Sequence, residues 1–162
     1  MNYAYLALGG NIGNKLENMG NAQELINARA GFIRRQSGIY ATAAWGNTQQ
    51  PDFYNKAVMI ETKLSPLQLL EELLNIETNM GRVRTTEKWT ERTMDIDILF
   101  YNDDIIAVPQ LKIPHPYIQE RKFVLVPLAE IAEGFVHPVF HKTIGQLLTE
   151  CSDASEVKRL TF

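Results

Sequence analysis

The stretch Glu91-Arg-Thr-Met-Asp-Ile-Asp-Ile-Leu-Phe-Tyr101 decides the fold, because it sets two carboxylates into a segment that otherwise has the composition of a buried β-strand. Branched and aromatic residues favour strands, and side chains two positions apart leave a strand on the same face. We therefore expect Asp95 and Asp97 to point the same way, with their backbones roughly 6 to 7 Å apart. Two ionised carboxylates at this separation repel by about 2.5 kcal/mol at an effective dielectric constant of about 20. The pair predicts a bound metal ion, with a solvated strand face as the alternative.

The chain before this strand alternates between strand and helix patterns. Ser65-Pro66-Leu67-Gln68 is a strong helix start, with serine as the N-cap, proline in the first turn and glutamine three residues after the cap. Gly81 is the expected end of that helix. Apolar residues at helical spacing between Leu16 and Ile26 predict an earlier helix. Strand patterns occur at residues 3–8, 32–40 and 53–64.

The resulting order is β-α-β-β-α-β, which is typical of an α+β, ferredoxin-like core with both helices on one face of an antiparallel sheet. The other face is expected to be free for a ligand. After Tyr101 the patterns predict a short hairpin at 103–108, a short helix at 123–132 and a helix capped by Thr143 that runs to Leu148. We interpret these segments as a C-terminal extension of a single domain covering residues 1–162.

The composition limits the classes of protein that fit. A chain of 162 residues with 45% hydrophobic residues can build one core, and a net charge of −3 argues against a dedicated nucleic-acid binder. Cys151 is the only cysteine, which excludes an internal disulfide and a cysteine-only zinc site. The N-terminus has no signal-peptide pattern, and no apolar run approaches 18 residues. We therefore expect a soluble cytoplasmic protein, with no membrane or nucleic-acid partner.

A cationic loop precedes the acidic strand. Arg82, Arg84, Lys88 and Arg92 fall within one short segment, and arginine offers a planar fork of donors that suits phosphate oxygens. Mg²⁺ characteristically binds through one or two carboxylates together with substrate phosphates, so acids, arginines and a nucleotide triphosphate fit together. Isolated surface arginines more often serve solubility, so the inference rests on their adjacency to the acids. The chain has no P-loop sequence.

Other residues could complete such a site. Asn55 can pair with a heterocycle that presents both a donor and an acceptor, Phe53 can stack beneath that ring, and Thr42 and Trp45 can supply another wall. A polar turn with core aromatics is the alternative for these residues. A second group, near residue 120, combines an imidazole, a guanidinium and an aromatic ring: His115, Arg121 and Phe123.

Three further residues raise structural questions. Glu77 falls on the apolar stripe of its helix, where it would need a partner such as Arg82 or Arg84 unless the helix end lets it reach water. His137 and His141 have no zinc-binding context, and we assign them no metal.

Several motifs together resemble 6-hydroxymethyl-7,8-dihydropterin pyrophosphokinase. They span nearly the whole chain in that family's order, and the Arg-Thr-x-Asp-x-Asp-Ile segment is its signature. The motifs are Ala7-Leu-Gly-Gly-Asn11, Gln50-Pro-Asp-Phe-Tyr-Asn55, Gly81-Arg-Val-Arg84, Arg92-Thr-Met-Asp-Ile-Asp97 and Pro114-His115 with Arg121-Lys-Phe-Val-Leu-Val-Pro-Leu128. The resemblance implies transfer of a pyrophosphoryl group from ATP to the hydroxymethyl oxygen of the pterin, giving AMP and the pterin diphosphate used in folate synthesis.

The resemblance also implies roles for matching positions. Asp95 and Asp97 would bind two Mg²⁺ ions, and Arg82 and Arg92 would join them in catalysis. ATP would be held by Arg84, Trp89, Ile98, His115 and Arg121. The pterin would be bound by Thr42, Trp45, Phe53, Asn55 and Phe123, with the rings of Phe53 and Phe123 on either side of it. A monomer is expected.

The chain departs from the family pattern in three places, and two other functions compete. Gly10 replaces a serine, Ala43-Ala44 replaces Pro-Pro, and Tyr117 stands where an arginine often supplies a phosphate contact. The Asp-x-Asp strand would also suit a metal-dependent nucleotidyltransferase, although no basic groove supports it. A ferredoxin-like binding or regulatory domain, with the acids as a solvated face, is the non-enzymatic alternative.

Overall fold

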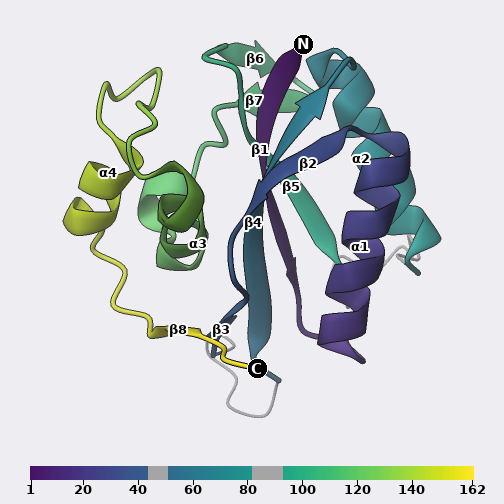
Figure 1. The fold of residues 1–162 in the computed structure, drawn as a ribbon. Helices are drawn as coiled ribbons and strands as arrows, with labels where there is room; N and C mark the ends of the chain where they lie inside the picture. Colours follow the sequence, from purple (N-terminus) through teal and green to yellow (C-terminus); the bar gives the residue numbers. More distant parts are fainter. Residues whose placement is uncertain (44–50, 82–92) are drawn as a thin grey trace.

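A computed structural model describes residues 1–43, 51–81 and 93–162 (Figure 1). The elements follow the order that the sequence predicts, with three differences. The segment at 32–40 forms two strands instead of one, the hairpin expected at 103–108 spans residues 106–113, and a further short strand lies at 157–159. They are β1 (Asn2–Gly10), α1 (Lys15–Arg29), β2 (Phe32–Gln36), β3 (Tyr40–Thr42), β4 (Phe53–Thr62), α2 (Pro66–Asn79), β5 (Asp95–Tyr101), β6 (Ile106–Val108), β7 (Leu111–Ile113), a 3-10 turn (Ile118–Glu120), α3 (Lys122–Ala132), α4 (Ile144–Glu150) and β8 (Val157–Arg159).

The predicted helix ends are confirmed where capping chemistry marked them. Ser65 and Gln68 form a reciprocal capping box at the start of α2, and Thr143 and Gln146 form another at the start of α4. Gly81 follows α2 with a φ of +96°, a conformation that costs glycine little and other residues much. These local signals, readable from the sequence, therefore fix where the two helices begin and where α2 ends.

The main sheet is antiparallel and has β1 near its centre. The strands lie in the order β5-β1-β4-β3-β8, and β2 also pairs with β4. The pairing of β1 with β5 shifts by one residue, so that Tyr5 lies opposite Phe100 while Leu6 lies opposite Ile98. The extra residue, Leu99, forms a bulge that lets consecutive residues of β5 reach the same core.

Helices lie on both faces of this sheet (Figure 1). One core joins Leu6 and Leu8 of β1 to apolar residues of α1 and α2. Tyr5 points the other way, into a second core with Leu125 and Leu128 of α3 and with residues of α4. The expectation that this second face would be free is wrong, because the apolar side of α3 needs burial and the sheet provides it. Within the described residues, a cavity remains on this face where the first turns of α3 meet the sheet.

No helix in the described ranges is long and apolar enough to cross a membrane.

Candidate active site

A cavity of about 280 Å³ opens between the sheet and the start of α3. Its floor comes from the ends of β1, β4 and β5, and its far wall comes from the first turns of α3. The lining residues are Ala7, Leu8, Gly9, Thr42, Ala43, Phe53, Asn55, Lys56, Ala57, Asp95, Asp97, Arg121, Phe123, Val124 and Pro127.

Strand register brings the acids and the amide together. Gly9 of β1 lies between Asn55 of β4 and Asp95 of β5, and Ala7 lies between Ala57 and Asp97 in the next row on the same face. Because Gly9 and Ala7 of β1 have small side chains or none, they leave space above the strand. The polar side chains of β4 and β5 on each side can therefore face a common ligand. Asp95 is partly buried and Asp97 is exposed. Both carboxylates line the cavity, as the alternation along β5 predicts.

Gly9 is required at its position. A Cβ atom there would stand 2.4 Å from Oδ1 of Asn55, well inside van der Waals contact. The Asn55 carboxamide therefore rests directly on the glycine backbone, and its orientation depends on the absence of a side chain at residue 9.

Two buried polar atoms in the lining lack a hydrogen-bond partner within the described structure. They are Nδ2 of Asn55 and Oγ1 of Thr42. Leaving a buried donor or acceptor unpaired costs roughly 1 to 3 kcal/mol, so such atoms are found where a ligand or ordered water completes them. Phe53 and Phe123 provide apolar surface beside them. The chemistry of this end of the cavity suits a flat heterocycle with both donors and acceptors.

Arg121 and His115 lie at the acidic end. The Arg121 guanidinium is 5.0 Å from the centre of the Tyr117 ring and 6.0 Å from that of Phe123. Tyr117, which replaces an arginine of the family pattern, therefore packs against a cation instead of adding one. This contact holds the Arg121 side chain beside the cavity that it lines.

His115 is fixed by two backbone contacts. The backbone N–H of His115 donates to the carbonyl of Leu99 at 3.0 Å, and the ring Nδ1 accepts the backbone N–H of Tyr117 at 3.2 Å. Burial lowers the pKa of His115 below its ordinary value, an effect that nearby Asp97 opposes and Arg121 reinforces. With Nδ1 occupied as an acceptor, the neutral ring carries its proton on Nε2, where it can donate to an anion.

Glu77 is buried at the end of α2, with 4% of its surface exposed. One carboxylate oxygen accepts the N–H of Ile96, between the two acids of β5, at 2.8 Å. Of the two alternatives for Glu77, the one in which the helix end lets it reach water is wrong. A partner in Arg82 or Arg84 falls outside the described residues.

The predicted site residues separate into three groups and His115, which does not line the cavity but lies close enough to Asp97 and Arg121 for their charges to affect it. Seven of them line the cavity together: Thr42, Phe53, Asn55, Asp95, Asp97, Arg121 and Phe123. The side chain of Ile98 lies in the core on the opposite face of the sheet, so only its backbone is available to a ligand at the strand edge. Five more lie outside the described residues: Trp45, Arg82, Arg84, Trp89 and Arg92.

Sequence reasoning missed the residues that shape the cavity without carrying charge. Gly9 and Ala7 form its floor, and Val124 and Pro127 extend the wall that Phe123 begins. The helical spacing of Phe123 and Pro127 could have indicated a shared face. The role of Gly9 could not have been inferred, because it depends on which residue of β4 lies opposite.

No group of three or more histidine, cysteine, aspartate or glutamate side chains suited to a metal ion occurs within the described ranges. Two carboxylates without a third protein ligand fit Mg²⁺, which keeps waters and substrate phosphates in the rest of its octahedron. They do not fit a structural zinc site.

A partly enclosed cavity with apolar walls, a few unsatisfied polar atoms and charged groups at one end is the kind of site that suits a small polar molecule next to an anionic one. Residues 5–133 match the family 7,8-dihydro-6-hydroxymethylpterin-pyrophosphokinase (HPPK). The chain belongs to this family.

Individual relatives agree with this assignment. The chain is 46% identical over 148 residues to the 2-amino-4-hydroxy-6-hydroxymethyldihydropteridine pyrophosphokinase of Synechocystis sp., covering 91% of this chain and 75% of the relative. It is 42% identical to the protein of the same name from Methylorubrum extorquens, covering 99% of both chains.

Solved structures support the fold. The HPPK-DHPS triple mutant of Plasmodium falciparum superposes with a TM-score of 0.77 at 20% identity, covering 92% of this chain and 43% of that one. The chain thus spans less than half of that two-part protein, and the likeness concerns the fold alone.

Proposed function

We propose that this chain transfers the pyrophosphoryl group of ATP to the hydroxymethyl oxygen of 6-hydroxymethyl-7,8-dihydropterin, giving AMP and the pterin diphosphate used in folate biosynthesis. The single observation that carries the proposal for this site is the row Asn55-Gly9-Asp95. It sets an amide with a free buried donor and a carboxylate on the two sides of a bare glycine floor. A bicyclic ring over Asn55 would thus present its substituent toward the acids.

The pterin end of the cavity works by shape and hydrogen bonding. The Asn55 carboxamide donates through Nδ2, and Thr42 adds a hydroxyl that can donate or accept. Phe53 and Phe123 cover the ring and exclude water from it. From the family resemblance we add Trp45 to this set.

The phosphate end works by charge. Arg121 and the Nε2–H of His115 would donate to phosphate oxygens, and the resemblance adds Arg82, Arg84, Trp89 and Arg92, with the backbone of Ile98 toward the nucleotide. We propose that Asp95 and Asp97 hold Mg²⁺, two ions by resemblance, which would neutralise charge on the phosphate oxygens. Glu77 holds β5 through Ile96 and so keeps the two acids in register.

The reaction needs no covalent link to the protein. The hydroxymethyl oxygen forms a bond to the β-phosphorus while the bond from that phosphorus to the bridging oxygen of AMP breaks, and the hydroxyl proton is released. Such transfers depend on positioning and on electrostatic stabilisation of the oxygens. The side chains described above supply these by fixing the pterin on one side and the triphosphate on the other.

The sheet order β5-β1-β4 with β2 on the far side of β4 supports a ferredoxin-like core for this enzyme. We further propose that residues 1–162 act as one domain and that the enzyme works as a monomer in the cytoplasm.

The decisive assay incubates the protein with Mg-ATP and 6-hydroxymethyl-7,8-dihydropterin and separates the nucleotides. AMP should accumulate in proportion to pterin diphosphate and only when both substrates are present. Formation of ADP, of free pyrophosphate, or of AMP without the pterin would refute the proposal. The same measurement excludes a nucleotidyltransferase, which would release pyrophosphate.

A further inference from the structure

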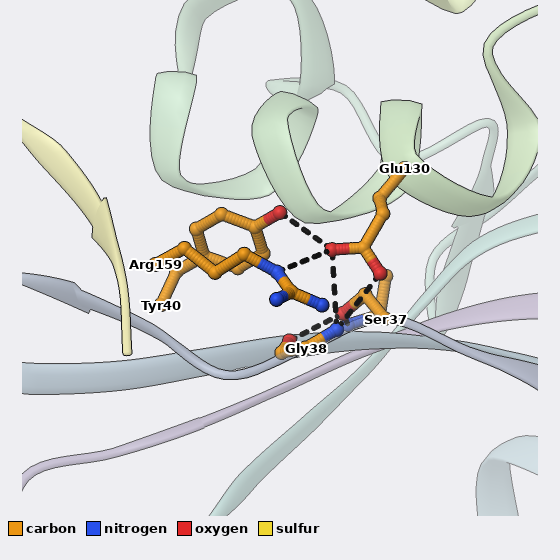
Figure 2. Close-up of polar contacts among 6 residues, drawn as sticks. Ser37, Gly38, Tyr40, Glu130 and Arg159 are labelled. Carbon is orange, nitrogen blue, oxygen red and sulfur yellow. Dashed lines mark hydrogen bonds and ion pairs between the residues drawn. The ribbon is translucent and has the colours of Figure 1, made fainter. Parts of the chain in front are cut away.

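Glu130, on α3, joins four parts of the chain through one carboxylate (Figure 2). Its Oε1 accepts the hydroxyl of Tyr40 at 2.6 Å and the Nε–H of Arg159 at 3.1 Å. Its Oε2 accepts the N–H of Gly38 at 3.0 Å. Gly38 lies between β2 and β3, Tyr40 begins β3 and Arg159 ends β8. A helix, a turn and two strands therefore meet at this carboxylate. We call the four residues Gly38, Tyr40, Glu130 and Arg159 the Glu130 clamp.

The turn at Gly38 is itself anchored to β4. The Ser37 N–H donates to the carbonyl of Ala57, and the N–H of Ala57 donates back to Oγ of Ser37, both at 2.9 Å. Ala57 lines the cavity two residues after Asn55. The position of Glu130 is therefore transmitted to the part of β4 that carries the amide.

Strand register places the clamp in the same row as the site. Arg159 lies opposite Tyr40, Tyr40 opposite Asn55, Asn55 opposite Gly9 and Gly9 opposite Asp95. Residues directly opposite each other in antiparallel strands present their side chains on the same face. Tyr40, which donates its hydroxyl to Glu130, is therefore the neighbour of Asn55 on the same face of the sheet.

Glu130 lies on the same helix as the residues that form the other wall of the cavity. On α3, Phe123, Pro127 and Glu130 are separated by four and three positions, which places them on one side of the helix. Phe123 and Pro127 line the cavity. A flat ring held between two aromatic side chains needs a gap of roughly 7 Å, twice the optimal distance between carbon atoms in contact. A helix shift of a fraction of this gap would spoil one of the two stacking contacts.

We propose that Glu130 is a positioning residue that sets the gap between the helix wall of the cavity, at Phe123, and the strand wall, at Phe53 and Asn55, with Tyr40 and Arg159 as its partners. This inference rests on the proposed function. Glu130 has no contact with the reacting atoms and acts through the elements that it joins. The reach of its side chain is therefore the property that matters most.

The ion pair between Arg159 and Glu130 is not explained by stability alone. The side chains of Arg159 and Glu130 are 57% and 30% exposed, and exposed ion pairs of this kind contribute little to folding. Arg159 also packs closely on Gly38, where a Cβ would come within 2.7 Å of its Nε. Such close packing at the edge of the sheet is consistent with a contact that fixes the distance between α3 and the strands.

Two variants separate the effect of the length of the Glu130 side chain from the effect of its negative charge. Glu130→Asp keeps the carboxylate but withdraws it by about 1.5 Å, one carbon–carbon bond, so it cannot reach Gly38 and Tyr40 together. Glu130→Gln keeps the reach and an oxygen that can accept from Tyr40 and Arg159. Its amide nitrogen cannot accept the Gly38 N–H as Oε2 does, but the retained oxygen already lies 3.3 Å from that N–H. The matched control is Lys142→Ala, which breaks the exposed pair between Lys142 and Glu150 at 2.7 Å, on residues outside the cavity lining.

Binding should be measured by titration calorimetry with 6-hydroxymethyl-7,8-dihydropterin, in the presence of an ATP analogue whose α–β bridging oxygen is replaced by methylene to block transfer. For Glu130→Asp we expect the pterin Kd to rise about tenfold, since small misplacements of a binding wall are costly. The KM for ATP should stay within about twofold, because the ATP contacts lie at the other end. Glu130→Gln should raise the pterin Kd by less than about threefold, and Lys142→Ala should leave it unchanged.

Unfolding in urea gives the readout that separates positioning from folding. All three variants should remain folded at the assay temperature. A pterin Kd for Glu130→Asp equal to that of the wild type, or a larger loss for Glu130→Gln than for Glu130→Asp, would overturn the positioning role. If the wild-type protein forms no pterin-dependent AMP, the proposed function itself fails, whereas an active wild type with an unaffected Glu130→Asp variant refutes this inference alone.

Discussion

Substitution of Gly9 by alanine should damage pterin binding while leaving ATP binding intact. The added Cβ would lie 2.4 Å from Oδ1 of Asn55, whereas ordinary contacts begin at 3.4 Å. The carboxamide must therefore move by about 1 Å, the difference between these distances. The next nearest neighbours of the new atom, the Asn55 Cγ and the backbone carbonyl of Tyr54, lie at 3.5 and 3.6 Å, so the Asn55 amide is the group that must give way.

The expected size of the effect follows from this displacement. A shift of about 1 Å removes or distorts the hydrogen bonds from Asn55 to the pterin, each worth about 0.5 to 1.5 kcal/mol net. Loss of two such bonds weakens binding by roughly 5- to 150-fold, since about 1.4 kcal/mol is a factor of ten. Overpacking at the same place should lower the free energy of unfolding by about 1 to 3 kcal/mol.

Calorimetry with the pterin, under the blocked-transfer conditions given above, and steady-state AMP formation provide the assay. Gly134→Ala is the matched control, because a Cβ at Gly134 meets no atom within 4 Å. Pterin binding by Gly9→Ala within twofold of the wild type would show that the Asn55 amide does not touch the ring, and the argument built on its row would fail. An equal loss of ATP affinity would indicate general disruption instead.

Three further predictions concern other parts of the molecule. Asp97→Ala should lower the rate of AMP formation at saturating substrates by at least about a hundredfold and change pterin affinity little, as single-turnover kinetics and calorimetry would reveal; near-normal turnover would remove Asp97 from the metal site. Gly20→Ala should raise the free energy of unfolding by about 0.5 to 1 kcal/mol in urea titration, because Gly20 lies inside α1 with no atom within 4 Å of an added Cβ. Burial, helped by nearby His141, lowers the pKa of His137 below its ordinary 6.5, so the unfolded chain gains a proton first and stability should fall as the pH drops below about 6.5. In His137→Asn, the amide oxygen can still accept the N–H groups of Val139 and Phe140. The free energy of unfolding of this variant should depend less steeply on pH, with the remaining dependence due to His115. The same pH dependence as in the wild type would show that His137 is not its source.

The sequence predicts those parts of the fold that depend on neighbours in the chain. The capping residues at Ser65 and Thr143 satisfy orphan N–H groups of their own helices, so their effect is local and readable. The alternation in β5 likewise determines that Asp95 and Asp97 share a face, whatever the strand pairs with. These features needed no knowledge of the tertiary structure.

Features that depend on pairing between distant segments could not be predicted in this way. The cover that α3 provides over the second sheet face follows from where the chain returns after β7, which no local pattern determines. The Asn55-Gly9-Asp95 row depends on two strand registers at once, and a slip of one residue in either would turn the polar groups to the opposite face. The burial of Glu77 arises from the approach of β5 to the end of α2.

The pairing of β8 with β3 has a consequence for the order of events during synthesis. Tyr40 and Glu130 are 90 positions apart, and Arg159 follows later still. Contacts between such distant segments form late, because loop closure must precede them. On the ribosome, the antiparallel pair of β1 and β4 and helices α1 and α2 can assemble well before residues 157–159 emerge. The nascent protein should therefore acquire its main core first and the contacts of Arg159 with Glu130 last, so a stalled chain lacking β8 would be folded but would bind the pterin more weakly.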